Sequence, residues 1–140
     1  MFFQNINYVT VVIAAILGMV VGYIWYSPWA FGKLWMKSKG WTEESMREAS
    51  KGKSMASSYA LMTLSTLVTA FILAALFNSL VVTSIVGMIV VALCVWIGFI
   101  VPTKLGDLLF GGDTRTFFLI SIGHGLVVAV VMSLVIGIWG

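Results

Sequence analysis

The chain has 140 residues, of which 61% are hydrophobic and 9% are charged, and its mean hydropathy is +1.08. Soluble domains carry about 25% charged residues, so this composition excludes an ordinary soluble protein and indicates an integral membrane protein. The formal net charge of +3 does not indicate a nucleic-acid partner, because the basic residues are mixed with acidic ones beside apolar runs, where they orient the chain and meet lipid headgroups.

Four apolar runs make up most of the chain, at about 8–26, 55–77, 80–101 and 116–139. A membrane-spanning helix needs roughly 20 residues, which is close to the length of each run. Apolar residues lie on every face, so the alternation of a strand is absent, and a lipid-exposed backbone has to satisfy its own hydrogen bonds within a helix. The sequence therefore predicts one all-α transmembrane domain over residues 1–140, folded as a four-helix bundle.

The first run is expected to be a retained span rather than a secretory signal. No basic segment precedes Tyr8, and no small-residue cleavage site follows the apolar stretch. Trp25, Tyr26 and Trp29 follow instead, as is typical of a helix end at the membrane interface.

The loop over 27–54 begins with the pattern of a short interfacial helix. Ser27 and Pro28 suit an N-cap and a first helical residue. The stretch 28–36 then places aromatic rings beside lysines, which suits a helix lying with its rings in lipid and its amines in water. Gly40 is expected to end this helix.

A second short helix is expected after Thr42, with Glu43 and Glu44 in its first turn opposing the positive end of the helix dipole. The whole loop is expected to lie on the membrane surface and to hold the ends of the spans in place. Docking of a partner, or gating, is the alternative use.

Every charged side chain lies in this loop or in a second one over 102–115. They are Lys33, Lys37, Lys39, Glu43, Glu44, Arg47, Glu48, Lys51, Lys53, Lys104, Asp107, Asp113 and Arg115. Four spans put both loops on one side of the membrane, and the positive-inside rule assigns that side to the cytoplasm. We expect a multi-pass protein of the prokaryotic plasma membrane with both termini outside.

A weak internal repeat relates the two halves. Gly22-Tyr-Ile-Trp followed by Pro28 compares with Gly98-Phe-Ile-Val followed by Pro102. Each half would be a helical hairpin, and both would enter in the same orientation, as in parallel transporter repeats. Chance similarity between apolar segments is the alternative.

Small residues recur four positions apart on three spans. They are Ala14, Gly18 and Gly22 on the first, Thr66, Ala70, Ala74 and Asn78 on the second, and Gly125, Ala129, Ser133 and Gly137 on the fourth. Residues at this spacing share a helix face, and small ones let helices approach closely in a membrane. Packing within the chain and a homodimer interface both remain open, and we expect a homo-oligomer.

His124 is the main candidate for a functional side chain. It lies roughly 10 Å from the cytoplasmic end of the fourth span at 1.5 Å per residue, and ionisable groups at such depth usually face protein or water. We expect Lys104 and Asp107, near the end of the third span, to line a cytoplasm-facing cavity with it. A neutral core histidine and an interfacial Lys104–Asp107 pair are the simpler alternatives.

No cofactor or metal is expected. Cys94 is the only cysteine, so an intrachain disulfide or a cysteine-based metal site is excluded. A lone histidine without a second histidine or a carboxylate beside it makes a weak metal site. It also lacks the neighbouring nucleophile or carboxylate that a catalytic histidine needs. The sequence therefore predicts a protein that is not an enzyme.

The first loop and the last span carry a family resemblance. The matching residues are Trp25, Tyr26, Ser27, Pro28, Phe31, Gly32, Lys33, Trp35 and Met36, together with His124. The chain resembles the prokaryotic membrane family catalogued as domain of unknown function 1761, which tends to show an aromatic residue where this chain has Gly123. The resemblance covers nearly the whole chain and implies a small four-span membrane protein, without implying an activity.

Two functions are compatible with these features. The first is a small homo-oligomeric transport or permeation unit with His124 in its cavity and a small molecule or ion as substrate. The second is a non-catalytic scaffold or accessory subunit that uses the aromatic first loop and the small-residue stripes as contact surfaces.

Overall fold

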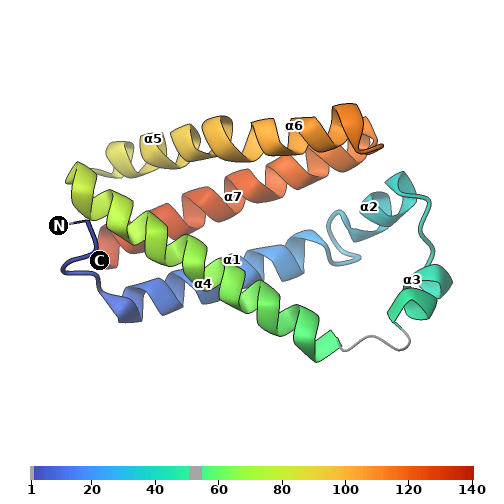
Figure 1. Ribbon diagram of the computed structural model, residues 1–140, viewed down its shortest axis with the longest axis horizontal. Coiled ribbons are helices and arrows are strands. Elements are labelled where there is room, and N and C mark those ends of the chain that lie inside the picture. The colour runs from blue at the N-terminus through green and yellow to red at the C-terminus, as the bar shows by residue number, and fades with distance from the viewer. Residues whose placement is uncertain (1, 51–54) are drawn as a thin grey trace.

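The computed structural model describes residues 2–50 and 55–140, and every regular element in them is a helix (Figure 1). The elements are α1 (Tyr8–Trp25), α2 (Gly32–Ser38), α3 (Glu43–Ser50), α4 (Met55–Leu80), α5 (Ile85–Val95), the π-helical turn η1 (Trp96–Ile100), α6 (Val101–Phe110) and α7 (Arg115–Trp139). The predicted all-α class is confirmed. Lys51 and Lys53 of the first charged loop lie outside the described residues.

Four helical stretches are long and apolar enough to cross a membrane: Tyr8–Trp25, Ala56–Leu80, Ile85–Phe110 and Arg115–Trp139. Their 18-residue windows reach a mean hydropathy between 2.2 and 2.7. The chain is therefore a multi-pass membrane protein, as its composition predicts.

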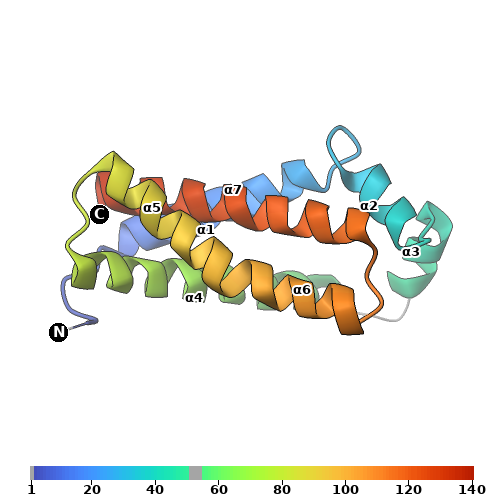
Figure 2. The same cartoon turned by 90° about the horizontal axis from the view of Figure 1, so that it is seen from above.

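Helix α7 lies at the centre of the bundle and packs against α1 on one side and α5 on the other (Figure 2). Its Met132 and Ser133 are fully buried. Small residues make this close packing feasible, since Ala14 of α1 and Ala70 and Ala74 of α4 belong to the same core. The predicted stripes are thus used, at these positions, for packing within the chain.

Helix α4 joins the core with only one half of its length. Ala70, Ala74 and Phe77 in its C-terminal half are buried, whereas residues 56–65 are exposed on every face. Figure 1 shows α4 running obliquely across the other helices, so that its N-terminal end diverges from α7. The buried part of α4 is therefore confined to the half of the molecule that lies away from α2 and α3.

The third apolar stretch is expected to end at Val101, but its helical path continues to Phe110. Pro102 cannot donate a backbone hydrogen bond, and its ring would crowd the carbonyl four residues earlier in a regular α-helix. The π-helical turn η1 lies immediately before it, and the N–H of Val101 donates to the carbonyl of Trp96 five residues back. Local widening of the helix thus accommodates the proline without a break.

The first charged loop contains two short helices, but the first begins later than expected. Ser27 does not cap α2, because its hydroxyl donates to the Ile24 carbonyl (2.7 Å) and closes the end of α1. Gly32 then begins α2 in a confined position, where an added Cβ would lie 2.3 Å from the Tyr26 carbonyl oxygen. Only glycine fits this turn.

Helix α3 has the expected cap. The Ser45 N–H donates to the Thr42 hydroxyl (3.0 Å), and the Thr42 N–H donates to the Ser45 hydroxyl (2.7 Å). Glu43 and Glu44 occupy the first turn, where negative charge opposes the helix dipole.

The first described residues and the C-terminus lie at the end of the bundle opposite α2 and α3 (Figure 1). The Thr10 hydroxyl donates to the Trp139 carbonyl (3.2 Å), and the Asn78 side chain donates to the carbonyls of Gln4 (3.1 Å) and Asn5 (3.3 Å). These contacts tie α1, α4 and α7 together at the uncharged end.

Replacing Ala14 with leucine is predicted to destabilise the bundle. Ala14 is 0% exposed, whereas Val12 on the same helix is 47% exposed. Overpacking a core costs about 1–3 kcal/mol, so Ala14→Leu should lower the midpoint of thermal unfolding in detergent, followed by circular dichroism. Val12→Leu is the matched control and should leave the midpoint unchanged. Equal midpoints for the two variants would contradict the described burial of Ala14 in the core.

Candidate functional site

His124 lies in the contact between α7 and α1. Its imidazole packs over the bare backbone of Gly22, where an added Cβ would lie 3.1 Å from Nε2. The Tyr26 ring lies on another side, with a centroid distance of 5.1 Å. The histidine is half-buried, so it is neither sealed in the core nor fully exposed.

Two glycines beside the histidine make room for large side chains from other helices. A Cβ on Gly123 would lie 2.9 Å from the Trp25 ring, and a Cβ on Gly125 would lie 2.8 Å from Ile100. The Gly-His-Gly sequence thus lets α1 and η1 approach α7 from two sides at the level of the imidazole.

Two tryptophan indoles hydrogen-bond to the backbone of α7 at the same level. Trp25 Nε1 donates to the Ile120 carbonyl (3.0 Å), and Trp96 Nε1 donates to the Ile122 carbonyl (2.7 Å). A buried indole N–H needs an acceptor, and these bonds fix both rings against α7. The position of the imidazole is therefore held by contacts from both flanking helices.

Tyr26 connects the histidine to the polar end of α1. Burial raises the pKa of its phenol above the usual value, and a side-chain hydrogen bond with Ser121 opposes that shift. The phenol consequently stays protonated at neutral pH and remains a hydrogen-bond donor. Ser121 is buried and lies one helical turn before His124.

Of the two expected neighbours of the histidine, only Lys104, on α6, is close enough to act on it electrostatically. Asp107 is exposed, and within residues 2–50 and 55–140 no ion pair joins it to Lys104. The continuation of the helix through η1 carries Lys104 over α7.

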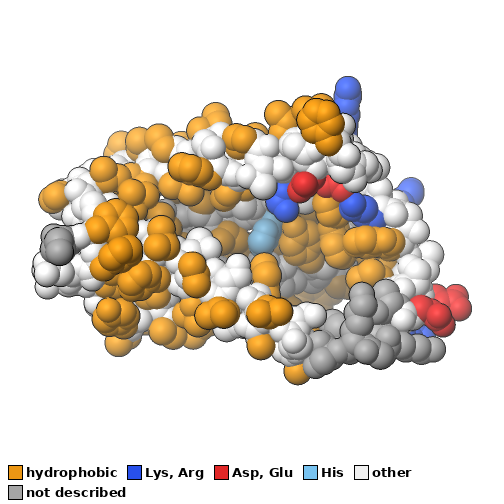
Figure 3. Space-filling model, in the orientation of Figure 1, with side chains coloured by type: hydrophobic (Ala, Val, Ile, Leu, Met, Phe, Trp, Pro, Cys, Tyr) orange, Lys and Arg blue, Asp and Glu red, His pale blue; other side chains and the backbone are white. Residues whose placement is uncertain are grey.

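The surface of the molecule is hollowed next to these residues. Figure 3 shows the single histidine, in pale blue, visible within the hollow, with basic and acidic side chains beside it and apolar side chains around it. In the shared orientation of Figures 1 and 3, the N-terminal half of α4 runs along the side of the hollow opposite α6. The imidazole thus has a route to the outside of the chain on this face.

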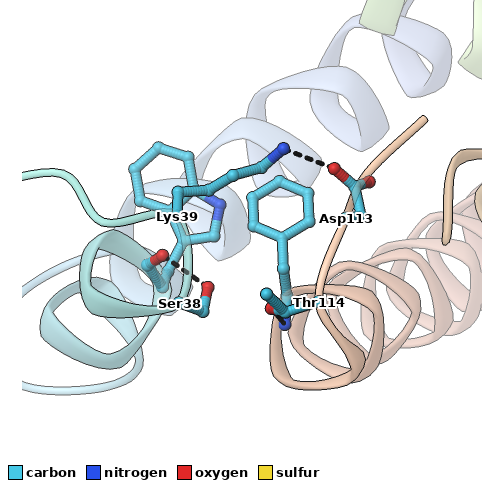
Figure 4. A network of polar contacts seen from close by, with 6 residues as sticks. Ser38, Lys39, Asp113 and Thr114 are labelled. Carbon is cyan, nitrogen blue, oxygen red and sulfur yellow. Dashed lines mark hydrogen bonds and ion pairs between the residues drawn. The ribbon is translucent and has the colours of Figure 1, made fainter.

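An ion pair joins the two charged loops at this end of the molecule. Lys39, just after α2, donates through Nζ to Asp113 Oδ1, just before α7 (Figure 4). The Lys39 ammonium also lies 4.4 Å from the centroid of the Phe117 ring, which adds a cation–π contact. The Thr114 hydroxyl accepts from the Phe117 N–H (3.1 Å) and so caps α7 beside the pair.

A continuous series of rings leads from the ion pair to the histidine. Phe117 stacks on Trp35 with centroids 6.1 Å apart, Trp35 contacts Tyr26 at 5.1 Å, and Tyr26 contacts His124 at 5.1 Å. The loop contact and the imidazole therefore belong to one packed unit.

The residues of the aromatic motif have structural roles in this unit. Trp25, Tyr26, Gly32 and Trp35 contribute the contacts given above, and Phe31 packs against Trp25 with centroids 4.6 Å apart. Pro28 is exposed in the turn between α1 and α2.

Sequence reasoning did not find Trp96, Ser121 or the Lys39–Asp113 pair. A tryptophan in the middle of an apolar run is a weak signal that its indole N–H donates to a buried acceptor. No comparable sequence signal marks Ser121 or the Lys39–Asp113 pair. Within the described part of the chain, no three His, Cys, Asp or Glu side chains lie close enough together to hold a metal ion.

Comparison with protein families assigns the chain to one family. The model of the family described as "Protein of unknown function (DUF1761)" matches residues 9–137. The chain belongs to this family, as the resemblance of residues 25–36 indicates. Neither the curated proteins nor the solved structures contain a match to it.

The Lys39–Asp113 pair is predicted to contribute measurably to stability. Its side chains are 25% and 11% exposed, so water screens the pair less than it screens a fully exposed one. A double-mutant cycle of Lys39→Ala and Asp113→Ala, measured by unfolding in mixed detergent micelles, should give a coupling free energy of about 1 kcal/mol.

Lys104→Ala and Asp107→Ala form the matched control cycle, because these residues are three apart on one helix and make no ion pair. Their coupling should be near zero. Equal coupling in both cycles would show that the loop contact is not specific.

Proposed function

We propose that this protein is a small, non-enzymatic transport or permeation unit in which His124 binds or relays the permeating species. The observation that carries the proposal is the position of the imidazole, half-buried between Gly22 and Tyr26 and visible in the hollow of Figure 3. A titratable side chain within a membrane-spanning helix is costly and usually serves a path for ions or substrates.

The polar groups around the histidine support a pathway rather than a reaction centre. Lys104 supplies a positive charge on one side, and the protonated Tyr26 phenol supplies a hydrogen-bond donor on another. These groups suit the binding of a proton, an anion or a small polar molecule. We assign no catalytic role to them, no cofactor and no nucleic-acid partner.

We place both charged loops in the cytoplasm and both termini outside a prokaryotic plasma membrane. All eight Lys and Arg residues belong to the two loops, and positive charge is retained on the cytoplasmic side. The hollow beside His124 would then lie on a lateral face of the bundle, in its cytoplasmic half.

We further propose that the bundle consists of two parallel hairpin repeats and functions as a homo-oligomer. The packing of α1 with α4 and of α5 with α7 supports the repeat. The exposed residues 56–65 of α4 support the oligomer, since a second copy would cover their apolar side chains.

A scaffold or accessory subunit is the second candidate. It is favoured by Trp29, which is 95% exposed in the first loop and which could meet a partner or the lipid interface. Gly32 and Trp35 are unsuitable probes of such docking, because both are packed inside the loop and their replacement would disturb the fold.

Flux into proteoliposomes tests the transport proposal. The wild-type chain, reconstituted at a defined protein-to-lipid ratio with a pH-sensitive dye inside, should dissipate an imposed pH gradient faster than empty liposomes. His124→Ala removes the titratable group and should return the rate to that of empty liposomes. Cys94→Ala, which alters an exposed side chain on α5, is the matched control and should keep the wild-type rate.

Gly22→Leu provides a second variant, since the new side chain would be forced against the imidazole, and it should also abolish flux. Equal rates for wild-type and empty liposomes, or for wild type and His124→Ala, would contradict proton permeation. Co-purification of a partner that is lost in Trp29→Ala would then favour the accessory role.

A further inference from the structure

A second cavity lies outside the histidine site, on the surface of the first charged loop. It has a volume of about 370 Å³, and its lining includes Lys33, Met36, Lys37, Trp41 and Glu43. It combines two amines and one carboxylate with the apolar surfaces of a methionine and a tryptophan. Of these residues, Trp41 also contacts the ring series that leads to His124, with its ring centroid 5.1 Å from that of Trp35.

The local fold creates this concavity. Lys33 and Lys37 are four apart on α2 and therefore share one face. Gly40 has φ +71°, a left-handed conformation that glycine adopts without strain, and it reverses the chain after α2. The Trp41 N–H then donates to the Met36 carbonyl (2.8 Å), so that the start of α3 faces the lysines.

The charges of the cavity suit a phosphate that carries a hydroxylated substituent. Two ammonium groups match a phosphodiester anion, and the Glu43 carboxylate can accept a hydrogen bond from a neighbouring hydroxyl group. Met36 and Trp41 offer apolar contact to the carbon atoms beside the phosphate. A free inorganic phosphate would use the lysines only.

The surroundings favour a lipid as the source of this phosphate. Trp29, Phe31 and Leu34 flank the lysines and are 95%, 38% and 48% exposed, which is favourable at the interface of a bilayer and unfavourable in water. Lysine stems can lie along such a surface with their amines in the headgroup layer. This step rests on the proposed placement of α2 at the cytoplasmic membrane surface.

We propose that this cavity is a binding site for the headgroup of an anionic glycerophospholipid with free hydroxyl groups, of the phosphatidylglycerol type. Lys33 and Lys37 hold the phosphodiester, Glu43 accepts from the headgroup hydroxyl, and Trp41 and Met36 contact the glycerol carbons. The site fixes the first loop to the lipid surface.

Native mass spectrometry of the full chain in detergent tests the site. Titration with phosphatidylglycerol should give one saturable adduct that phosphatidylcholine gives much more weakly and inorganic phosphate does not displace. A lysine near a lipid headgroup contributes about fivefold to affinity. Lys33→Gln and Lys37→Gln should each weaken the adduct by about that factor, and Lys33→Arg/Lys37→Arg should retain it.

Arg115→Gln is the matched control, because it removes one exposed positive charge at the same end of the molecule and outside the cavity. It should leave the affinity unchanged. Equal losses for Arg115→Gln and Lys33→Gln, equal binding of both lipids, or displacement by phosphate would overturn the proposal. Because mass spectrometry measures lipid binding and not flux, failure of this test is distinguishable from failure of the transport proposal.

Discussion

Charged side chains are costly inside a bilayer, by about 2.5–3.5 kcal/mol each at the centre of a span, and this constraint organises the whole chain. All charges lie in two loops, and the fold brings these loops to one end of the bundle, where Lys39 and Asp113 pair. The opposite end is closed by uncharged contacts of Asn7, Thr10 and Asn78. The distribution of charge along the sequence therefore determines which ends of the four spans lie together, independently of how their side chains pack.

Close packing between α1 and α7 then determines where His124 can lie. Within lipid, helix association depends on small residues and hydrogen bonds rather than on a hydrophobic driving force. Gly22 admits the imidazole, and Gly123 and Gly125 admit Trp25 and Ile100. Residues 56–65 of α4 stay exposed, and the half-buried histidine borders a hollow and not a sealed core.

Much of this arrangement follows from the sequence, and the remainder depends on contacts between segments. Hydrophobicity alone predicts the spans, because each apolar run is near the length that crosses a bilayer. The sequence does not predict the path beyond Val101, since proline normally ends a helix and the compensating π-helical turn has no simple sequence signal. The Trp96 hydrogen bond to Ile122 and the Lys39–Asp113 pair join residues 26 and 74 positions apart, and no local pattern specifies such partners.

Cysteine accessibility in intact cells tests the central arrangement most directly. Single cysteines are introduced in a Cys94→Ala background by Thr83→Cys or by Glu44→Cys. Position 83 lies between α4 and α5, position 44 lies on α3, and both are exposed. A membrane-impermeant maleimide should label Thr83→Cys in intact cells and Glu44→Cys only after the membrane is opened. Labelling of Glu44→Cys in intact cells, or of both positions alike, would contradict four crossings with the charged loops in the cytoplasm.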